Sequence, residues 1–96
     1  MPKGYLVANI RVTDAEKFQA FAGMAAPAIK KYGGKVLARG PSADRHEGEL
    51  SGTVMMIEFE SKKAAETFYF SEEYQAAKAV RETCSDTDLM IIEEAE

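Results

Sequence analysis

Tryptophan is absent from the 96 residues, and cysteine and histidine occur once each. The lone cysteine, Cys84, excludes an internal disulfide, and nothing indicates an oxidising compartment. The lone histidine, His46, has no second histidine or cysteine at ligand spacing, so a metal or haem site has weak support. We therefore expect no cofactor and no metal. We interpret His46 as an exposed side chain at a strand edge, with a ligand-binding role as the alternative.

Long apolar runs and basic runs are also missing. No apolar stretch approaches the roughly 18 residues that a membrane helix needs, and none precedes a cleavage site as in a signal peptide. Lys and Arg total 12 against 16 Asp and Glu, a net charge of −4. This balance argues against a nucleic-acid partner, which needs a basic face. We expect a cytoplasmic protein that binds neither nucleic acid nor a membrane.

The composition that remains is typical of one folded domain. Apolar residues make up 46% of the chain and charged residues 29%, so disorder is not expected. A chain of this length forms a single domain, here residues 1–96, and buries roughly two thirds of its unfolded surface. Its core is thin enough that a subunit interface would add stability.

Period-two patterns predict four strands. They are expected at residues 4–12, 35–39, 53–60 and 87–93. The second strand is expected to continue over 44–49 after a turn at Gly40-Pro41-Ser42, and another turn is expected at 50–52.

The first helix is predicted from a capping box, with Thr13 as N-cap and Glu16 at the third helical position. Apolar residues then follow at helical spacing up to Tyr32, where Gly33-Gly34 is a strong stop signal. Pro27 lies inside this helix. Because proline removes a backbone donor, we expect a kink or a break near residues 24–26.

Ser61 and Ser71 are good N-cap residues and predict two further helical segments, the second running to about residue 83. The order strand–helix–strand–strand–helix–strand is the split pattern of ferredoxin-like folds. We therefore predict an α+β fold with one antiparallel sheet and helices on one face. Its covered face is predicted to hold a wholly apolar set: Leu6, Ala8, Ile10, Val12, Met55, Ile57 and Phe59.

The other sheet face is also rich in apolar residues. It is predicted to carry Tyr5, Val7, Val54, Met56 and either Met90 or Leu89. Patches of this kind usually mark an interface. A two-fold partner packed sheet against sheet would cover it, so we expect a homodimer.

A set of short motifs also stands in a familiar order along the chain: Gly4-Tyr5-Leu6, Val12-Thr13-Asp14, Tyr32-Gly33-Gly34, Arg39-Gly40, Glu47-Gly48, Glu58-Phe59, Phe68-Tyr69, Ser71, Tyr74 and Arg81. With these motifs the chain resembles the uncharacterised family called domain of unknown function 1330, in the dimeric α+β barrel superfamily. The resemblance covers nearly the whole chain and departs from the family pattern at Pro41, where a second glycine is common. It implies a homodimer whose sheets face each other as a barrel, and it implies no established reaction.

Polar residues on the predicted helix-free face are the first candidates for chemistry. Asn9 and Arg11 share this face on the first strand, and Glu58 lies on it in the third. Since these strands are antiparallel neighbours in a ferredoxin-like sheet, Arg11 and Glu58 are expected to pair, with Arg39 beside them. One interpretation is a barrel pocket where Arg11 and Arg39 hold a carboxylate or enolate and Glu58 is the general base. The alternative is a structural ion pair at the dimer interface.

Other polar residues carry weaker signals. Tyr32, Tyr69 and Tyr74 could place hydroxyls at a pocket mouth, or anchor helices to the sheet edge; Tyr32 is counted with Asn9, Arg39 and His46 as ligand-binding. Tyr74 and Arg81, seven residues apart, share one side of a helix. We interpret that side as packed and solvated, with a pocket wall as the alternative. Cys84 is expected to be a half-buried structural thiol, because the end of a helix disfavours a thiolate.

Two functions fit these patterns. The first is a cofactor-independent enzyme that acts on a small organic acid or polyketide-like molecule in the barrel pocket. The second is a non-catalytic ligand-binding or structural homodimer. Fold does not decide between them, and whether the protein is an enzyme stays open at this point.

Overall fold

Four strands and three helices make up the chain, of which the structure, a computed structural model, describes residues 2–40 and 43–95. In chain order the elements are β1 (Gly4–Val12), α1 (Ala15–Lys31), β2 (Lys35–Gly40), β3 (Thr53–Phe59), α2 (Lys62–Tyr69), α3 (Glu72–Glu82) and β4 (Ser85–Glu93). The strand and helix positions predicted from the sequence are largely confirmed. The predicted turn at 40–42 includes Pro41 and Ser42, which lie outside the described residues.

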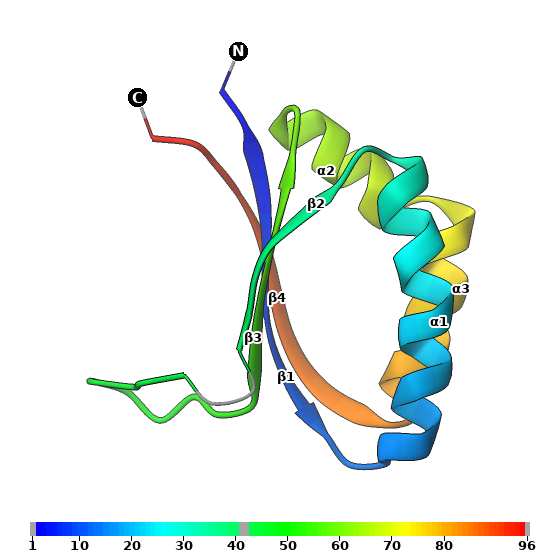
Figure 1. Cartoon of the computed structure of the whole chain (residues 1–96), viewed down its shortest axis with the longest axis vertical. Coiled ribbons are helices and arrows are strands. Elements are labelled where there is room, and N and C mark those ends of the chain that lie inside the picture. Colours follow the sequence, from blue (N-terminus) through cyan, green and yellow to red (C-terminus); the bar gives the residue numbers. More distant parts are fainter. Residues whose placement is uncertain (1, 41–42, 96) are drawn as a thin grey trace.

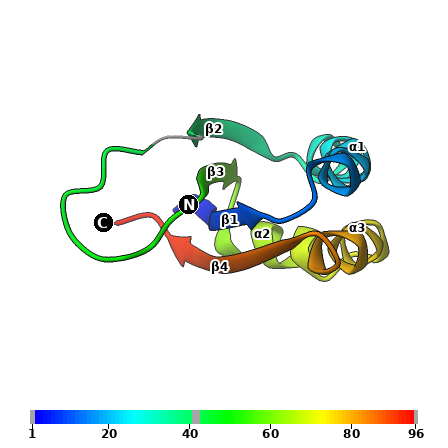
Figure 2. The ribbon, with the colours of Figure 1, turned by 90° about the horizontal axis from the view of Figure 1, so that it is seen from below.

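The strands form one antiparallel sheet in the order β2-β3-β1-β4. All three helices lie on the same side of it (Figure 1). Seen from below, α1 lies toward the β2 edge and α3 toward the β4 edge (Figure 2). The predicted ferredoxin-like α+β fold with helices on one sheet face is confirmed.

Alternation along the strands sets the two faces of the sheet. Leu6, Ala8 and Ile10 of β1 point to the helices and are 2–5% exposed. Ile57 and Phe59 of β3 join them in the core. Val12 was predicted in this set, but at the end of β1 it is 41% exposed.

Helix α1 begins one residue later than predicted. Its N-cap is Asp14, whose Oδ1 accepts the backbone N–H of Lys17 at 3.2 Å. Thr13 instead donates its backbone N–H to the carbonyl of Cys84 at 2.8 Å. A carboxylate at the N-cap also interacts favourably with the helix dipole.

Of the kink or break expected near residues 24–26, the break does not occur, and α1 runs without interruption from Ala15 to Lys31. Proline removes one intrahelical hydrogen bond, while Ala25 and Ala28 remain buried against the rest of the fold. Tertiary packing of this kind sustains helices that local preference alone would interrupt.

The end of α1 is fixed by the predicted glycine pair. Gly33 has a positive φ of 78°, which glycine adopts without steric cost. Its N–H donates to Lys30 O at 3.2 Å, and the N–H of Gly34 donates to Ile29 O at 2.8 Å. This is the Schellman arrangement, and it stops the helix after Lys31 as the sequence predicts.

The predicted continuation of the second strand over 44–49 is wrong. Residues 43–52 form an exposed loop that extends from the sheet on the side away from the helices (Figure 1). Gly48 and Gly52 have φ values of 87° and 103°, outside the extended region that a strand needs. Arg45 ties the loop down by donating to Asn9 Oδ1 at 3.3 Å and to Gly52 O at 2.8 Å.

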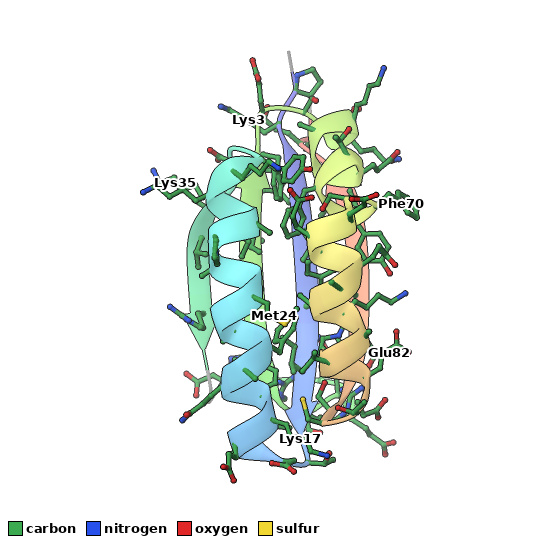
Figure 3. The ribbon with its side chains drawn as sticks, turned by 90° about the vertical axis from the view of Figure 1, so that its right-hand side faces the viewer. Lys3, Lys17, Met24, Lys35, Phe70 and Glu82 are labelled. Atoms are coloured by element: carbon green, nitrogen blue, oxygen red, sulfur yellow. The ribbon has the colours of Figure 1, made fainter. Side chains whose placement is uncertain are left out.

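The predicted caps of the later helices are confirmed. Ser61 Oγ accepts the N–H of Ala64 at 3.0 Å, and Ser71 Oγ accepts the N–H of Tyr74 at 3.1 Å. Helices α1 and α3 then run side by side in front of the sheet (Figure 3). None of the helices that the structure describes is long and apolar enough to span a membrane.

The helix-free face carries the apolar side chains predicted for it. Val7 lies opposite Met56 on β3 and opposite Met90 on β4, so Met90 takes this face and Leu89 faces the helices. Met90 and Ile92 are 48% and 46% exposed in the single chain.

A polar clamp joins the C-terminal end of α1 to the N-terminal turn of α3. Lys31 Nζ forms an ion pair with Glu73, and the Tyr32 hydroxyl donates to Glu73 Oε1 at 3.0 Å. The hydrogen bond from Lys31, followed by bonds from the Glu73 backbone and from Tyr32, lowers the pKa of Glu73 from 4.5 to about 2.

This depressed pKa gives the clamp a defined pH dependence. Its contribution to folding is present above pH 4.5, where the carboxylate is ionised in both states, and is lost as pH falls toward 2. We expect urea unfolding of Glu73→Gln to show a smaller loss of stability between pH 5 and pH 2 than the parent shows. Glu72→Gln, one residue earlier, is the control and should follow the parent. An identical acid profile for Glu73→Gln and the parent would contradict the clamp.

Candidate ligand-binding site

A cavity of about 240 Å³ lies between the sheet and the helices. Its floor is the helix-facing side of all four strands, and residues of α1, α2 and α3 line the rest of it. The cavity is therefore formed within one chain, on the sheet face opposite to the one where the sequence predicted a pocket.

The hollow arises where α1 presents small side chains to the sheet. Ala22, Ala25 and Ala26 line the cavity from α1, and Ala8 lines it from β1. A methyl group fills little of the space between a helix and a sheet, which stand about 10 Å apart. The volume left between them is not filled by larger residues.

The cavity has an open side and a closed end. Its exposed lining residues, Ala22 and Ala26 of α1 and Val36 and Arg39 of β2, mark a mouth between α1 and the β2 edge. The buried lining residues from α2 and α3, Phe68, Tyr74 and Arg81, mark the far end. A molecule that enters at the mouth would thus meet Arg39 first and Arg81 last.

Arg81 is the unusual residue of this site, because its positive charge is buried without a carboxylate partner. The residue is only 6% exposed. Its Nη1 donates to Tyr74 Oη at 2.6 Å, while Nε has no hydrogen-bond partner among the described residues. Burying a charge in this way is costly unless something compensates it.

The nearby carboxylates are engaged elsewhere. Glu82 and Asp86 line a second, more open depression that also touches Arg81. Glu82 pairs with Lys78 at 3.7 Å, and Asp86 pairs with Arg11 at 3.3 Å. Neither forms a salt bridge with Arg81 in the described structure, so the guanidinium keeps an uncompensated charge at the cavity.

Contacts with aromatic rings partly stabilise the buried positive charge of Arg81. Its Cζ lies 6.0 Å from the centroid of the Phe21 ring and 5.9 Å from that of Tyr74. A ring face attracts a cation, although more weakly than a carboxylate does. Burial raises the pKa of Tyr74 above 10, with Arg81 acting in the opposite direction, so its hydroxyl stays protonated at neutral pH.

The remaining lining is apolar or neutral. Three phenylalanine rings line the cavity, from Phe18, Phe21 and Phe68. The lining also includes the flexible side chain of Met55, the branched side chain of Leu89 and the hydroxyl of Thr53. No described residue of the lining carries a carboxylate, an imidazole or a thiol. The two charged groups of the cavity are thus both guanidinium groups.

The pairing predicted between Arg11 and Glu58 is wrong. In the register of β1 with β3, Glu58 lies opposite Tyr5, whereas Arg11 lies beyond the last paired residue, Ile10. Their strands are neighbours, but the two residues stand at opposite ends of the sheet. Glu58 instead lies 4.0 Å from Lys3 Nζ.

Arg11 has no free donor edge for a ligand. Its Nε and Nη2 bond Asp86 and Asp88 at 3.3 and 2.7 Å, and its Nη1 donates to Ser51 O at 3.1 Å. Arg11 and Glu58 therefore do not line a common pocket. Their roles as catalytic residue and general base remain predictions.

Arg39 does not lie with Arg11. It pairs with Met55, and Val36 pairs with Ile57, so the four residues 36–39 of β2 oppose the three residues 55–57 of β3 across an irregularity near Leu37. Such a bulge moves the following side chains to the opposite face. Arg39 consequently lines the helix-side cavity, and its prediction as a helix-free-face residue is wrong.

The three other predicted ligand-binding residues lie outside the cavity lining. Asn9 is 8% exposed on the helix-free face and accepts from Arg45. Tyr32 belongs to the Glu73 clamp. His46 is exposed, in the 43–52 loop rather than at a strand edge. Within residues 2–40 and 43–95, no cluster of side chains could hold a metal ion.

The pair that the structure brings to the cavity, Tyr74 and Arg81, was visible in the sequence. Their seven-residue spacing puts them on one side of α3, and the pocket wall was the alternative interpretation of that side. The other signal is the alanine-rich stretch of α1, which predicts a helix face too small to fill the space above the sheet.

Comparison with known proteins identifies the family. The model for a domain of unknown function, DUF1330, matches residues 3–95. The chain belongs to this family. The resemblance stated from the sequence motifs is thus confirmed, and no curated protein matches the DUF1330 chain significantly.

Several solved structures share the fold. A protein of unknown function from Rhodopseudomonas palustris is 18% identical, with a TM-score of 0.80 over 99% of this chain and 84% of that one. A dimeric ferredoxin-like protein of unknown function from Jannaschia sp. CCS1 is 12% identical, with a TM-score of 0.72 over 98% and 99%. SnoaB, a cofactor-independent oxygenase from Streptomyces nogalater, is 9% identical, with a TM-score of 0.69 over 100% and 96%. At these identities the likeness is one of fold.

The buried charge predicts an unusual response to mutation. Replacing Arg81 by methionine removes the desolvation cost and keeps the side-chain volume, so we expect the free energy of unfolding to stay level or rise by about 1 kcal/mol. Urea denaturation of the ligand-free protein measures this. Arg39→Met makes the same change of charge at an exposed position and should stay within about 0.5 kcal/mol of the parent. A loss above about 3 kcal/mol in Arg81→Met alone would instead identify Arg81 as a structural residue.

Proposed function

We propose that this DUF1330 protein binds a small, largely apolar anion in the cavity between its sheet and helices. The observation that carries this proposal is Arg81, a buried guanidinium that lines the cavity with its Nε unpaired. A guanidinium keeps its positive charge at any ordinary pH. An anion placed in the cavity would supply the countercharge that the chain itself lacks.

The shape of the cavity limits what can bind. An apolar cavity of about 150 Å³ can hold benzene, so a cavity of about 240 Å³ suits a ligand with one ring rather than an extended polycycle. The walls are apolar, and polar groups are few and placed at the two ends. This combination is typical of small-molecule sites, in which a few polar groups orient a mostly apolar ligand.

The lining favours binding over acid–base catalysis. A general base must lie within hydrogen-bond reach of the proton that it removes, and the described lining offers no carboxylate, imidazole or thiol. Tyr74 is a poor base, because burial raises its pKa further.

An oxygenase is the second candidate, and the fold shared with SnoaB supports it. In that case the substrate would have to enter already ionised, with Arg81 holding its negative charge during the reaction with oxygen. For an enzyme acting on a small organic acid or polyketide-like substrate, the proposed substrate site is then the helix-side cavity and not the barrel interior.

Binding can be tested with small anions that share a ring and differ in their charged group. Benzoate and benzenesulfonate should raise the melting temperature of the parent by mass action, while acetate and neutral benzyl alcohol should leave it nearly unchanged. Arg81→Met should abolish the shift. Arg11→Met is the control for the site first predicted from the sequence, and it should respond like the parent.

Two outcomes would count against this proposal. If no ring-bearing anion raises the melting temperature at millimolar concentration, the cavity is not an anion site. If the shift survives in Arg81→Met and disappears in Arg11→Met, the anion binds on the helix-free face.

We also propose that the protein is a homodimer that packs its helix-free sheet faces together. The apolar residues of that face, among them Val7, Met56, Met90 and Ile92, support this assembly, and so does the dimeric neighbour from Jannaschia. The ligand cavity lies on the opposite side of the sheet. Dimer formation would therefore leave its mouth between α1 and β2 open.

Met56→Asp tests the dimer, because it places a charge in the centre of the proposed interface. Light scattering after size exclusion should give about twice the 10.5 kDa chain mass for the parent and a monomer or an unfolded chain for the variant. Glu60→Asp, at an exposed position after β3, is the control and should elute as a dimer. A monomeric parent, or an unchanged Met56→Asp, would contradict the assembly.

A further inference from the structure

The buried donor of Arg81 that lacks a hydrogen-bond partner is its Nε. Nη1 is used by Tyr74, and neither Nε nor the neighbouring Nη2 bonds a described residue. These two nitrogens present parallel N–H bonds on one side of the planar group. Such a fork matches the two oxygens of a carboxylate, which it binds in a bidentate manner.

Tyr74 adds a third donor at the same place. Its oxygen already accepts from Arg81 at 2.6 Å, and its own proton has no acceptor among the described residues. Because burial keeps the phenol protonated, this hydroxyl can donate to a ligand oxygen. The two residues sit seven apart on α3, so one rigid helix fixes their relative positions.

We infer that the cavity is selective for an aromatic carboxylate of about the size of benzoate, held by the Nε–Nη2 edge of Arg81 and the Tyr74 hydroxyl. The inference rests on the proposed function and names its ligand class. The carboxylate takes the buried end of the cavity, and the ring lies toward the mouth between α1 and β2.

The aromatic side chains that line the cavity favour a ligand with an aromatic ring. Phe18, Phe21 and Phe68 line the cavity around Tyr74, and the Phe21 and Tyr74 centroids lie 6.4 Å apart in an edge-to-face arrangement. Aromatic rings gain from offset or edge-to-face contact with a further ring. A flat carboxylic acid therefore suits these walls better than a puckered ring of the same size.

Variants of Arg81 and Tyr74 test whether benzoate binding needs the planar geometry of the guanidinium group or only its positive charge. Arg81→Lys keeps a positive charge but offers no planar edge, so titration calorimetry should show benzoate binding weakened about tenfold or more. Tyr74→Phe removes one donor and should weaken it about fivefold. Arg45→Lys makes the matched exchange in the exposed 43–52 loop, outside the cavity lining, and should leave the affinity within about twofold of the parent. Circular dichroism and the melting temperature of each variant establish that it is folded.

A series of related ligands tests whether the cavity prefers an aromatic carboxylate. Benzoate should bind the parent at least about fivefold more tightly than benzenesulfonate, whose tetrahedral group fits a planar fork less well, and than cyclohexanecarboxylate, which lacks a flat ring. Equal affinity of benzoate for the parent and Arg81→Lys, or equal affinity of benzoate and benzenesulfonate, would overturn the inference while leaving an anion site intact. If neither aromatic anion binds, the proposed function fails together with it.

Discussion

The buried charge of Arg81 is the constraint on which the rest of the site depends. The guanidinium is packed among aromatic rings at the end of α3, and the described chain gives it one hydroxyl and no carboxylate. Nearby acidic residues that could neutralise it are paired with Lys78 and Arg11 instead. A protein with four more negative than positive charges thus keeps one positive charge without a carboxylate partner beside a cavity, where the proposed anion would supply the countercharge.

Rigid elements of the fold hold the buried Arg81 guanidinium in place. Ser71 caps α3 and sets the direction from which Tyr74 and Arg81 approach the sheet. The Glu73 clamp ties the same helix to the end of α1. Small residues on α1 leave the cavity open in between, and the Schellman turn at Gly33 sends the chain to β2, whose bulge brings Arg39 to the mouth. The helix-free face lies on the other side, so the proposed ligand and the proposed partner sheet would use opposite sides of the sheet.

Much of the fold followed from the sequence because its signals are local. Strand alternation, the Ser61 and Ser71 caps and the Gly33-Gly34 stop each depend on neighbouring residues. The site did not follow, because it depends on register and on a bulge. Arg11 and Glu58 share a face but not a position along it, and the irregularity near Leu37 carries Arg39 to the other side. Periodicity fixes which residues share a face, whereas strand pairing decides which of them meet.

The state of the Arg81 side chain can be observed directly by NMR. In uniformly ¹⁵N-labelled protein, the Nε–H of Arg81 should give a resolved signal at neutral pH, because burial protects it from exchange with water, and Arg81→Met identifies it by its loss. On titration with benzoate, that signal should move strongly downfield as a charge-assisted hydrogen bond forms. An Arg81 signal that stays in place while benzoate shifts resonances elsewhere would contradict a ligand held by this guanidinium.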